Sequence, residues 1–148
     1  MTRRPYRPSA DREEVLALFG GDSRVIDSPG QRIHVATNAA GAIIGAVVWI
    51  DMGKEHGGWL ANVVLGRGAT IADIYRLALS ACEDAIALEQ TQGRFIIRSR
   101  ALLAILQRDF KIDAKPSSWE PTTGTPVEWE VWVDLAGARA QLTARGVT

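Results

Sequence analysis

An apolar strand, a turn of small residues and a long helix follow one another without interruption between residues 58 and 88. The run 59–65 is apolar and rich in strand-forming residues, Gly66, Arg67 and Gly68 break it, and a helical pattern begins at Thr70. A strand that leads directly into a helix leaves unpaired backbone N–H groups at the helix start, here beside the cation of Arg67. Such a turn suits an anion such as a phosphate, and a purely structural strand-to-helix turn is the alternative, because every such turn needs small residues.

The helix predicted over 70–88 has apolar residues spaced by threes and fours. They stand at positions 71, 74, 77, 78, 81, 82, 85, 86 and 88. This period is typical of an amphipathic helix packed on a sheet. Cys82, the single cysteine, falls on the apolar face, so we expect it to pack as a small apolar side chain and we expect no internal disulfide.

Strands are predicted on both sides of this unit. Alternation in 31–37, turn residues 38–41 and an apolar β-branched run 42–50 predict a hairpin whose second strand is the more deeply buried. A short buried strand is expected over 94–98. Residues 126–135 alternate with period two and predict a strand whose buried face carries Val127, Trp129, Val131 and Val133.

The remaining segments read as helices and connections. They are a helix over 12–19 preceded by Ser9 and Asp11, a polar loop 51–58, a helix over 101–106, a turn region around Pro116 and Pro121, and a tail 136–148 that forms a short helix or a loosely attached end. Together with the strands they predict a single α/β (α+β) domain over 1–148, with a mixed, mostly antiparallel sheet flanked by helices.

The composition narrows the class of partner. Lysine plus arginine and aspartate plus glutamate both total 17 in 148 residues, so the formal net charge is zero. We therefore expect no nucleic-acid and no membrane partner. No segment approaches the roughly 20 apolar residues of a membrane span, and the basic start lacks the apolar run of a signal peptide. A cytoplasmic protein is expected.

At this point the chain resembles the GNAT superfamily of acyl-CoA N-acyltransferases. The opening stretch 6–19 looks like that family's first strand and helix, and Gly41–Trp49 looks like its central hairpin, with Gly45 embedded. The family's acyl-CoA loop reads Gln or Arg, two free positions, Gly, one free position, then Gly or Ala. Arg67 and Ala72 match this pattern, and Thr70 stands where the family has glycine.

The resemblance implies an acetyl-CoA site. The backbone amides of Gly68, Ala69, Thr70, Ile71 and Ala72, with the Arg67 side chain, are expected to bind the CoA pyrophosphate. Backbone groups of Val63, Val64 and Leu65 are expected to orient the thioester carbonyl. A hydroxyl on Thr70 could itself donate to a phosphate.

A second family signature places a tyrosine five residues before the phenylalanine of a Gly-Phe pair. Phe110 matches the phenylalanine, but Asp109 replaces the glycine and Ile105 takes the tyrosine position. The family's tyrosine commonly protonates the departing thiolate, and isoleucine cannot do so.

A general base is sought in the loop before the third strand. Glu55 and His56 are the catalytic candidates, with Asp51 behind them, and a solvated connection is the alternative interpretation. His34 reads as a half-buried strand residue rather than a base, and the two histidines and Cys82 lack ligand-like spacing, so no metal is expected.

The sequence supports two hypotheses of function from different classes. The first is an acyl-CoA-dependent N-acyltransferase that transfers an acetyl group to an amine on a small molecule or a protein. The alternative is a catalytically inactive GNAT-fold structural or protein-interaction module, as in the degenerate GNAT-like proteins that some bacteriophages encode, located within a virion and binding a protein partner or forming a homo-oligomer. Thr70, Ile105 and Asp109 favour the alternative, and Trp119 and Trp132 are its candidate contact residues. Four arginines, Arg94, Arg98, Arg100 and Arg108, form a basic cluster that suits an anionic partner or a solvated edge.

Overall fold

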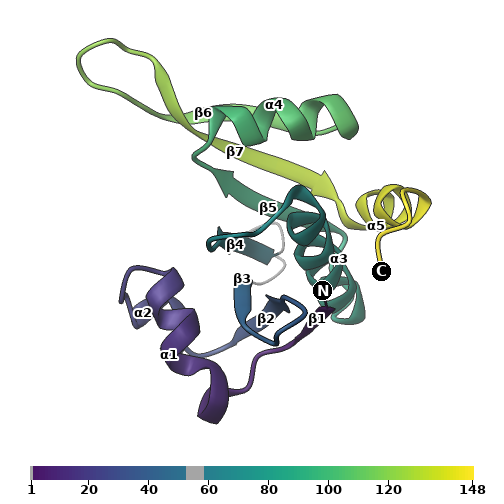
Figure 1. The fold of residues 1–148 in the computed structure, drawn as a ribbon. Coiled ribbons are helices and arrows are strands. Elements are labelled where there is room, and N and C mark those ends of the chain that lie inside the picture. The colour runs from purple at the N-terminus through teal and green to yellow at the C-terminus, as the bar shows by residue number, and fades with distance from the viewer. Residues whose placement is uncertain (1, 53–58) are drawn as a thin grey trace.

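The computed structural model describes residues 2–52 and 59–148, and within these ranges the strands form one seven-stranded sheet (Figure 1). The strand order is β1-β2-β3-β4-β5-β7-β6. The strands are β1 (Thr2–Pro5), β2 (Gln31–Thr37), β3 (Ile43–Asp51), β4 (Trp59–Leu65), β5 (Gln92–Ile97), β6 (Asp113–Trp119) and β7 (Pro126–Asp134). The helices are α1 (Pro8–Leu18), α2 (Arg24–Asp27), α3 (Ile71–Ala87), α4 (Arg100–Asp109) and α5 (Leu135–Ala144).

The sheet consists of two antiparallel halves. Strands β1 to β4 form one half and β5, β7 and β6 form the other. The halves meet where β4 and β5 pair in parallel. The predicted fold class, a mixed and mostly antiparallel sheet flanked by helices, is therefore confirmed.

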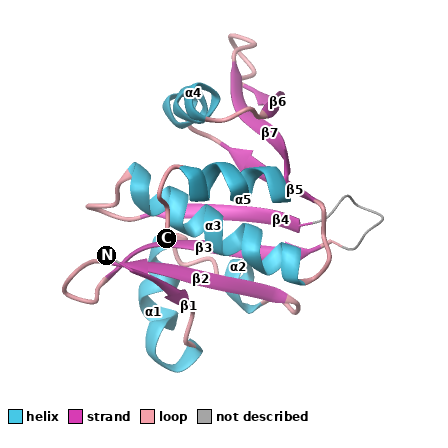
Figure 2. Ribbon diagram, turned by 90° about the vertical axis from the view of Figure 1, so that its right-hand side faces the viewer, coloured by secondary structure: helices cyan, strands magenta, loops and turns pink. Residues whose placement is uncertain are grey.

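Helices cover both faces of the first half. Helices α1 and α2 pack on one face, where Val15 and Ile26 meet side chains of β2 and β3. Helices α3 and α5 pack on the opposite face against Val47 and Trp49 (Figure 2). Strand β3 is thus buried on both sides, which confirms the prediction that the second hairpin strand is the more deeply buried.

Helix α4 packs on the second half through Leu103, which meets Ile97, Trp129 and Val131. Leu102 and Leu106 on the same helix also approach the core formed by α3 and α5. The second half therefore carries α4 and α5 close to α3, while the hairpin of β6 and β7 extends away from the body of the molecule (Figure 1).

Most predicted elements are found with shifted ends. The hairpin, the strand 59–65, the long helix and the strand from Pro126 are confirmed. Helix α1 starts at Pro8 rather than at 12, because the Asp11 carboxylate reaches back to accept the Arg7 N–H at 2.8 Å. The short helix α2 was not predicted.

Two further expectations differ from the structure in the second half. The prediction of a turn around Pro116 is wrong, because residues 113–119 form β6 along the edge of the sheet. Val127 does not lie on a buried face and is 43% exposed, since the pairing of β7 with β5 ends at Trp129. The tail forms α5, whose Leu142 is buried against α3.

Across the described ranges, each helix is too short or too polar to cross a lipid bilayer.

Candidate functional site

The turn after β4 is anchored to the sheet by Gly66. Its N–H donates to the Ile44 carbonyl at 2.8 Å, and a Cβ built on Gly66 would lie 2.8 Å from Leu18 Cδ2. Gly68 has φ +84°, a left-handed conformation that favours glycine. The turn thus favours glycine at these two positions for different reasons. Gly66 permits close packing on α1, and Gly68 permits the left-handed backbone before α3.

Helix α3 starts with a buried carboxylate in its first turn. Asp73, fully buried, accepts the Thr70 N–H at 2.8 Å and the Thr70 hydroxyl at 3.0 Å, and Arg76 donates to it at 3.1 Å. Thr70 has an extended backbone, with φ −119° and ψ 170°, so its position does not require glycine. Its amide is committed to Asp73, and the Ala69 N–H donates to the Gly66 carbonyl at 3.3 Å, so these two predicted amides are not free for a ligand.

Other amides of the turn remain free to bind a ligand. Within the described part of the chain, the N–H groups of Gly68, Ile71 and Ala72 make no hydrogen bond to the protein. They lie at the positive end of a 17-residue helix, and the Arg67 side chain beside them is exposed. This helix start can accept an anion despite the buried Asp73.

Strands β4 and β5 separate beyond their parallel ladder. Among the described residues the ladder pairs Trp59 with Gly93 and ends at Ala61 and Phe95, whereas β4 continues to Leu65 and β5 to Ile97. Val63 and Leu65, just past the ladder, are each 38% exposed. The edge of β4 that leads to the α3 turn is therefore open where the two halves of the sheet diverge.

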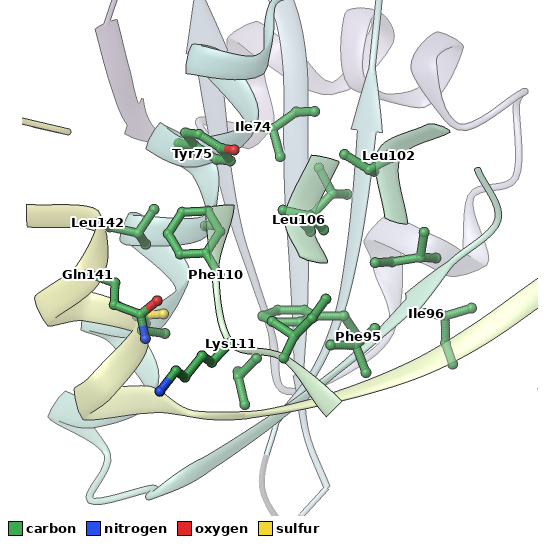
Figure 3. Close-up of a pocket in the computed structure, with 18 of the residues that line it drawn as sticks. Ile74, Tyr75, Phe95, Ile96, Leu102, Leu106, Phe110, Lys111, Gln141 and Leu142 are labelled. Atoms are coloured by element: carbon green, nitrogen blue, oxygen red, sulfur yellow. The ribbon is translucent and has the colours of Figure 1, made fainter. Parts of the chain in front are cut away.

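A cavity of about 530 Å³ occupies this region (Figure 3). It reaches Val63 on β4 and continues between α3, α4, α5 and the strands β5 and β7, with Ala78, Phe95, Leu102, Leu106 and Val133 in its wall. The wall is mostly apolar, as expected for a pocket that binds a small molecule or an acyl group. Of the predicted cofactor residues, Val63 thus lies in the wall of the cavity, and the remainder, Val64 to Ala72, lead from β4 into α3.

One corner of the cavity is closed by a network around Asp109. The Tyr75 hydroxyl donates to Asp109 at 2.7 Å, and Arg108 and Arg145 pair with the same carboxylate at 2.9 and 3.3 Å. The Tyr75 ring meets Phe110 edge to face at 5.1 Å, and the Arg145 guanidinium lies over both rings. The Arg108 and Tyr75 hydrogen bonds hold the pKa of Asp109 well below its usual range, while burial and then the bond to Asp109 raise the pKa of Tyr75 to about 12.

The family's second signature takes a different form here. Phe110 ends α4 and faces the cavity, and Asp109, at the family's glycine position, accepts the Tyr75 hydrogen bond. Sequence reasoning missed Tyr75 because it is 34 residues from Asp109 and lies within an amphipathic helix. No pattern in the sequence identifies that pair.

Only some of the candidate bases lie within the described residues. Glu55 and His56 lie outside the described residues. Asp51, behind them, is the last residue of β3 and is exposed. His34 is confirmed as a half-buried strand residue, 16% exposed, and its Nε2 lies 2.6 Å from Asp84 Oδ2.

Cys82 is buried in the core, as predicted, and burial raises the pKa of its thiol to about 12. In residues 2–52 and 59–148 there is no group of histidine, cysteine, aspartate and glutamate side chains arranged to hold a metal ion.

The tryptophans and arginines singled out in the sequence have different surroundings in the fold. Trp132 donates to Glu130 at 2.6 Å and lies under the Arg94 guanidinium, whereas Trp119 is 53% exposed. Each of the four arginines has its own partner. Arg94 pairs with Glu130, Arg98 with Glu128, Arg108 with Asp109, and Arg100 lies over Trp129.

Comparison with known proteins identifies the architecture. No protein-family model and no curated protein sequence matches the chain. Among solved structures, a mutant of the spermidine N-acetyltransferase SpeG from Vibrio cholerae is similar with TM-score 0.66 at 11% identity, over 93% of this chain and 97% of that one. The GNAT superfamily phosphinothricin acetyltransferase from Sinorhizobium meliloti, solved in complex with AcCoA, gives TM-score 0.64 at 13% identity, over 90% and 87% of the two chains. A putative acetyltransferase from Acinetobacter baylyi gives 0.65 at 12% identity, over 92% of each.

The chain has the fold of the GNAT superfamily of acetyltransferases. At these levels of identity the likeness concerns the fold alone.

Proposed function

We propose that this protein is an acyl-CoA-dependent N-acyltransferase that acts on an amine. The observation that carries the proposal is the opening between β4 and β5, where the cavity meets Val63 and β4 leads to the free amides at the start of α3. An apolar slot next to an anion-binding helix start matches a ligand that has a long neutral arm and a pyrophosphate. The AcCoA complex of the phosphinothricin acetyltransferase supports this choice of ligand.

Each part of the site has a defined task under this proposal. The amides of Gly68, Ile71 and Ala72 and the exposed Arg67 hold the pyrophosphate. Backbone groups of β4 from Val63 to Leu65, which are not paired with β5, orient the donor's carbonyl. The thioester supplies an activated acyl group, and Glu55 or His56 accepts the proton that the amine loses as its nitrogen replaces sulfur on the carbonyl carbon.

Because Ile105 replaces the family's tyrosine, we expect a slower rate but the same reaction. The Tyr75 hydroxyl lines the same cavity, but its proton is held by Asp109. A thiol with an ordinary pKa of about 8.5 leaves as a thiolate without a strong proton donor. A positioned acid contributes about 10²–10⁴-fold to such steps, so we expect turnover slower than that of enzymes with the tyrosine.

Isothermal titration with CoA and acetyl-CoA tests the proposal directly. We expect saturable binding that Arg67→Glu weakens by about tenfold or more, because a carboxylate then faces the pyrophosphate. Arg24→Glu is the control, because it changes the charge by the same amount on α2, which packs against the opposite face of the sheet. Absence of binding at millimolar ligand would contradict the proposal.

One observation favours the alternative, an inactive interaction module. Trp119 is 53% exposed at the end of the edge strand β6, on the hairpin that extends from the body of the molecule (Figure 1). Large exposed aromatic side chains are typical of interface anchors. Under this alternative the chain forms a homo-oligomer that Trp119→Ser disrupts, as measured by sedimentation, and CoA does not bind.

A further inference from the structure

The cavity continues well past the place where the proposed thioester would lie. Along α3 its wall includes Ile74, Ala78 and Cys82, which are spaced i, i+4 and i+8 on one face. Cys82 is 1% exposed and belongs to the core beneath the cavity, so the hollow follows α3 for about one turn, from Ile74 to Ala78, and continues to α5. The cavity of about 530 Å³ takes the donor's neutral arm, and an acetyl group of two carbons adds little to the volume that this arm fills.

The extension reaches the place where α3 and α5 pack together. Helix α3 contributes Ala78 and Cys82 to the wall, and α5 contributes Gly137 and Ala138. Gly137 is fixed in place because its N–H donates to the Asp134 side chain at 3.0 Å, and a Cβ there would lie 2.8 Å from the same carboxylate. The start of α5 therefore borders the cavity at the end of β7.

Most of the rest of the wall is hydrocarbon, with the side chains of Lys111 and Gln141 at the α5 end (Figure 3). Phe95, Val131 and Val133 come from the sheet, with Leu102 and Leu106 from α4 on the other side (Figure 3). Val131 is 1% exposed. An uncharged, flexible hydrocarbon chain is the group that such a wall accepts at least cost, because a polar group there would lose its hydrogen bonds to water.

We propose that the donor is a medium-chain acyl-CoA, whose hydrocarbon tail lies between α3, α5 and the strands β5 and β7. This inference rests on the proposed function. The β4–β5 ladder ends at Phe95, and Val63 lies just beyond it on β4, so a carbonyl oriented by β4 borders the cavity that Phe95 and Ala78 also line. The transfer itself is unchanged: the amine nitrogen bonds to the carbonyl carbon, the carbon–sulfur bond breaks, and the amine proton passes to the base.

Titration of the full chain with CoA, acetyl-CoA, butyryl-CoA and octanoyl-CoA tests the inference without any variant. Each methylene that becomes buried contributes roughly fourfold in affinity. We expect octanoyl-CoA to bind more tightly than acetyl-CoA by about tenfold or more, with butyryl-CoA between them. If octanoyl-CoA binds no more tightly than acetyl-CoA while CoA itself binds, the medium-chain inference is wrong and the acyltransferase proposal stands. If none of the four ligands binds, the acyltransferase proposal is wrong as well.

Substitution on α5 locates the tail. Ala138→Leu fills the extension, so we expect it to lower octanoyl-CoA affinity by about tenfold while acetyl-CoA affinity stays within about twofold. Ala140→Leu, at an exposed position of the same helix, should change neither affinity. Equal effects of Ala138→Leu on both ligands, in a variant whose circular dichroism and Tm match the wild type, would place the tail elsewhere and overturn the assignment.

Discussion

The Tyr75 hydroxyl donates a 2.7 Å hydrogen bond to the Asp109 carboxylate, which joins the start of α3 to the end of α4. The two helices flank the cavity, so this bond fixes how far apart they stand at that corner. Arg145 adds a contact from the chain after α5, since it pairs with Asp109 and lies over both Tyr75 and Phe110.

Loss of that bond should loosen the corner without unfolding the protein. We expect Tyr75→Phe to lower the free energy of unfolding by about 1 kcal/mol, because the carboxylate loses one of its donors but keeps Arg108 and Arg145. Urea denaturation followed by circular dichroism measures the change. Tyr6→Phe is the matched control, and an equal loss there would remove any special role from the Tyr75 bond.

Acid should destabilise the protein through Asp11. Arg4 binds its carboxylate at 2.7 and 3.0 Å, and this hydrogen bonding, with that of the Arg7 amide, lowers the pKa of Asp11. Because the folded pKa lies below the unfolded value of about 3.9, the folded state binds fewer protons in that window. The stabilisation is therefore complete above the unfolded pKa and disappears as pH falls through the folded pKa.

The measurement is the pH dependence of the unfolding free energy in the wild type and in Asp11→Asn. We expect the variant to be less stable at pH 7 by about 1.5–3 kcal/mol, since charged hydrogen bonds are lost, and to show a shallower decline below the unfolded pKa. Parallel pH profiles for the two proteins would show that Asp11 does not cause the acid sensitivity.

The two glycines of the turn should respond differently to alanine. A Cβ at Gly66 meets Leu18 at 2.8 Å and the Ile44 carbonyl at 3.3 Å, so we expect Gly66→Ala to cost about 1–3 kcal/mol of stability. Leu18→Ala, added to it, removes the closer clash and should recover part of that loss. At Gly68 a Cβ meets open space, and the cost of about 1–2 kcal/mol comes from φ +84° alone, with no recovery from Leu18→Ala. Thermal denaturation of five variants decides between these outcomes: each glycine variant with and without Leu18→Ala, and Leu18→Ala by itself.

The threonine in the glycine position should matter for the helix more than for the ligand. Thr70→Gly removes the hydroxyl bond to Asp73 but keeps the extended backbone and its amide, so we expect a loss of a few tenths of a kcal/mol. CoA affinity should stay within about twofold, because the amides assigned to the ligand belong to other residues. A large gain in CoA affinity would show instead that the Thr70 side chain obstructs the site.

Local patterns were sufficient to predict most of the fold. The long helix, the hairpin and the strand from Pro126 have strong periodicity, and each is found. Strand β6 has no such pattern, since Asp113–Trp119 contains Pro116 and two serines and is ordered by its pairing with β7 at the edge of the sheet. Its strand character depends on a partner that the local sequence does not reveal.

The candidate site was predictable only in part. The turn 66–72 can be recognised because its residues are contiguous. The end of the β4–β5 ladder and the Tyr75–Asp109 bond depend on how distant segments meet, and the cavity is lined by residues from helices and strands that are far apart in the chain. Spacing along one segment carries no information on any of these.

The parallel ladder between β4 and β5 spans three residue pairs in the described part of the chain, and it is the strand contact through which the two antiparallel halves are joined. A ligand bound beyond the end of that ladder contacts both halves of the sheet where β4 and β5 are not paired. Because such a ligand binds the joined halves more tightly than separated ones, its binding also stabilises the pairing of β4 with β5. Saturation of the site and slower hydrogen exchange in β4 and β5 are then two readouts of one equilibrium.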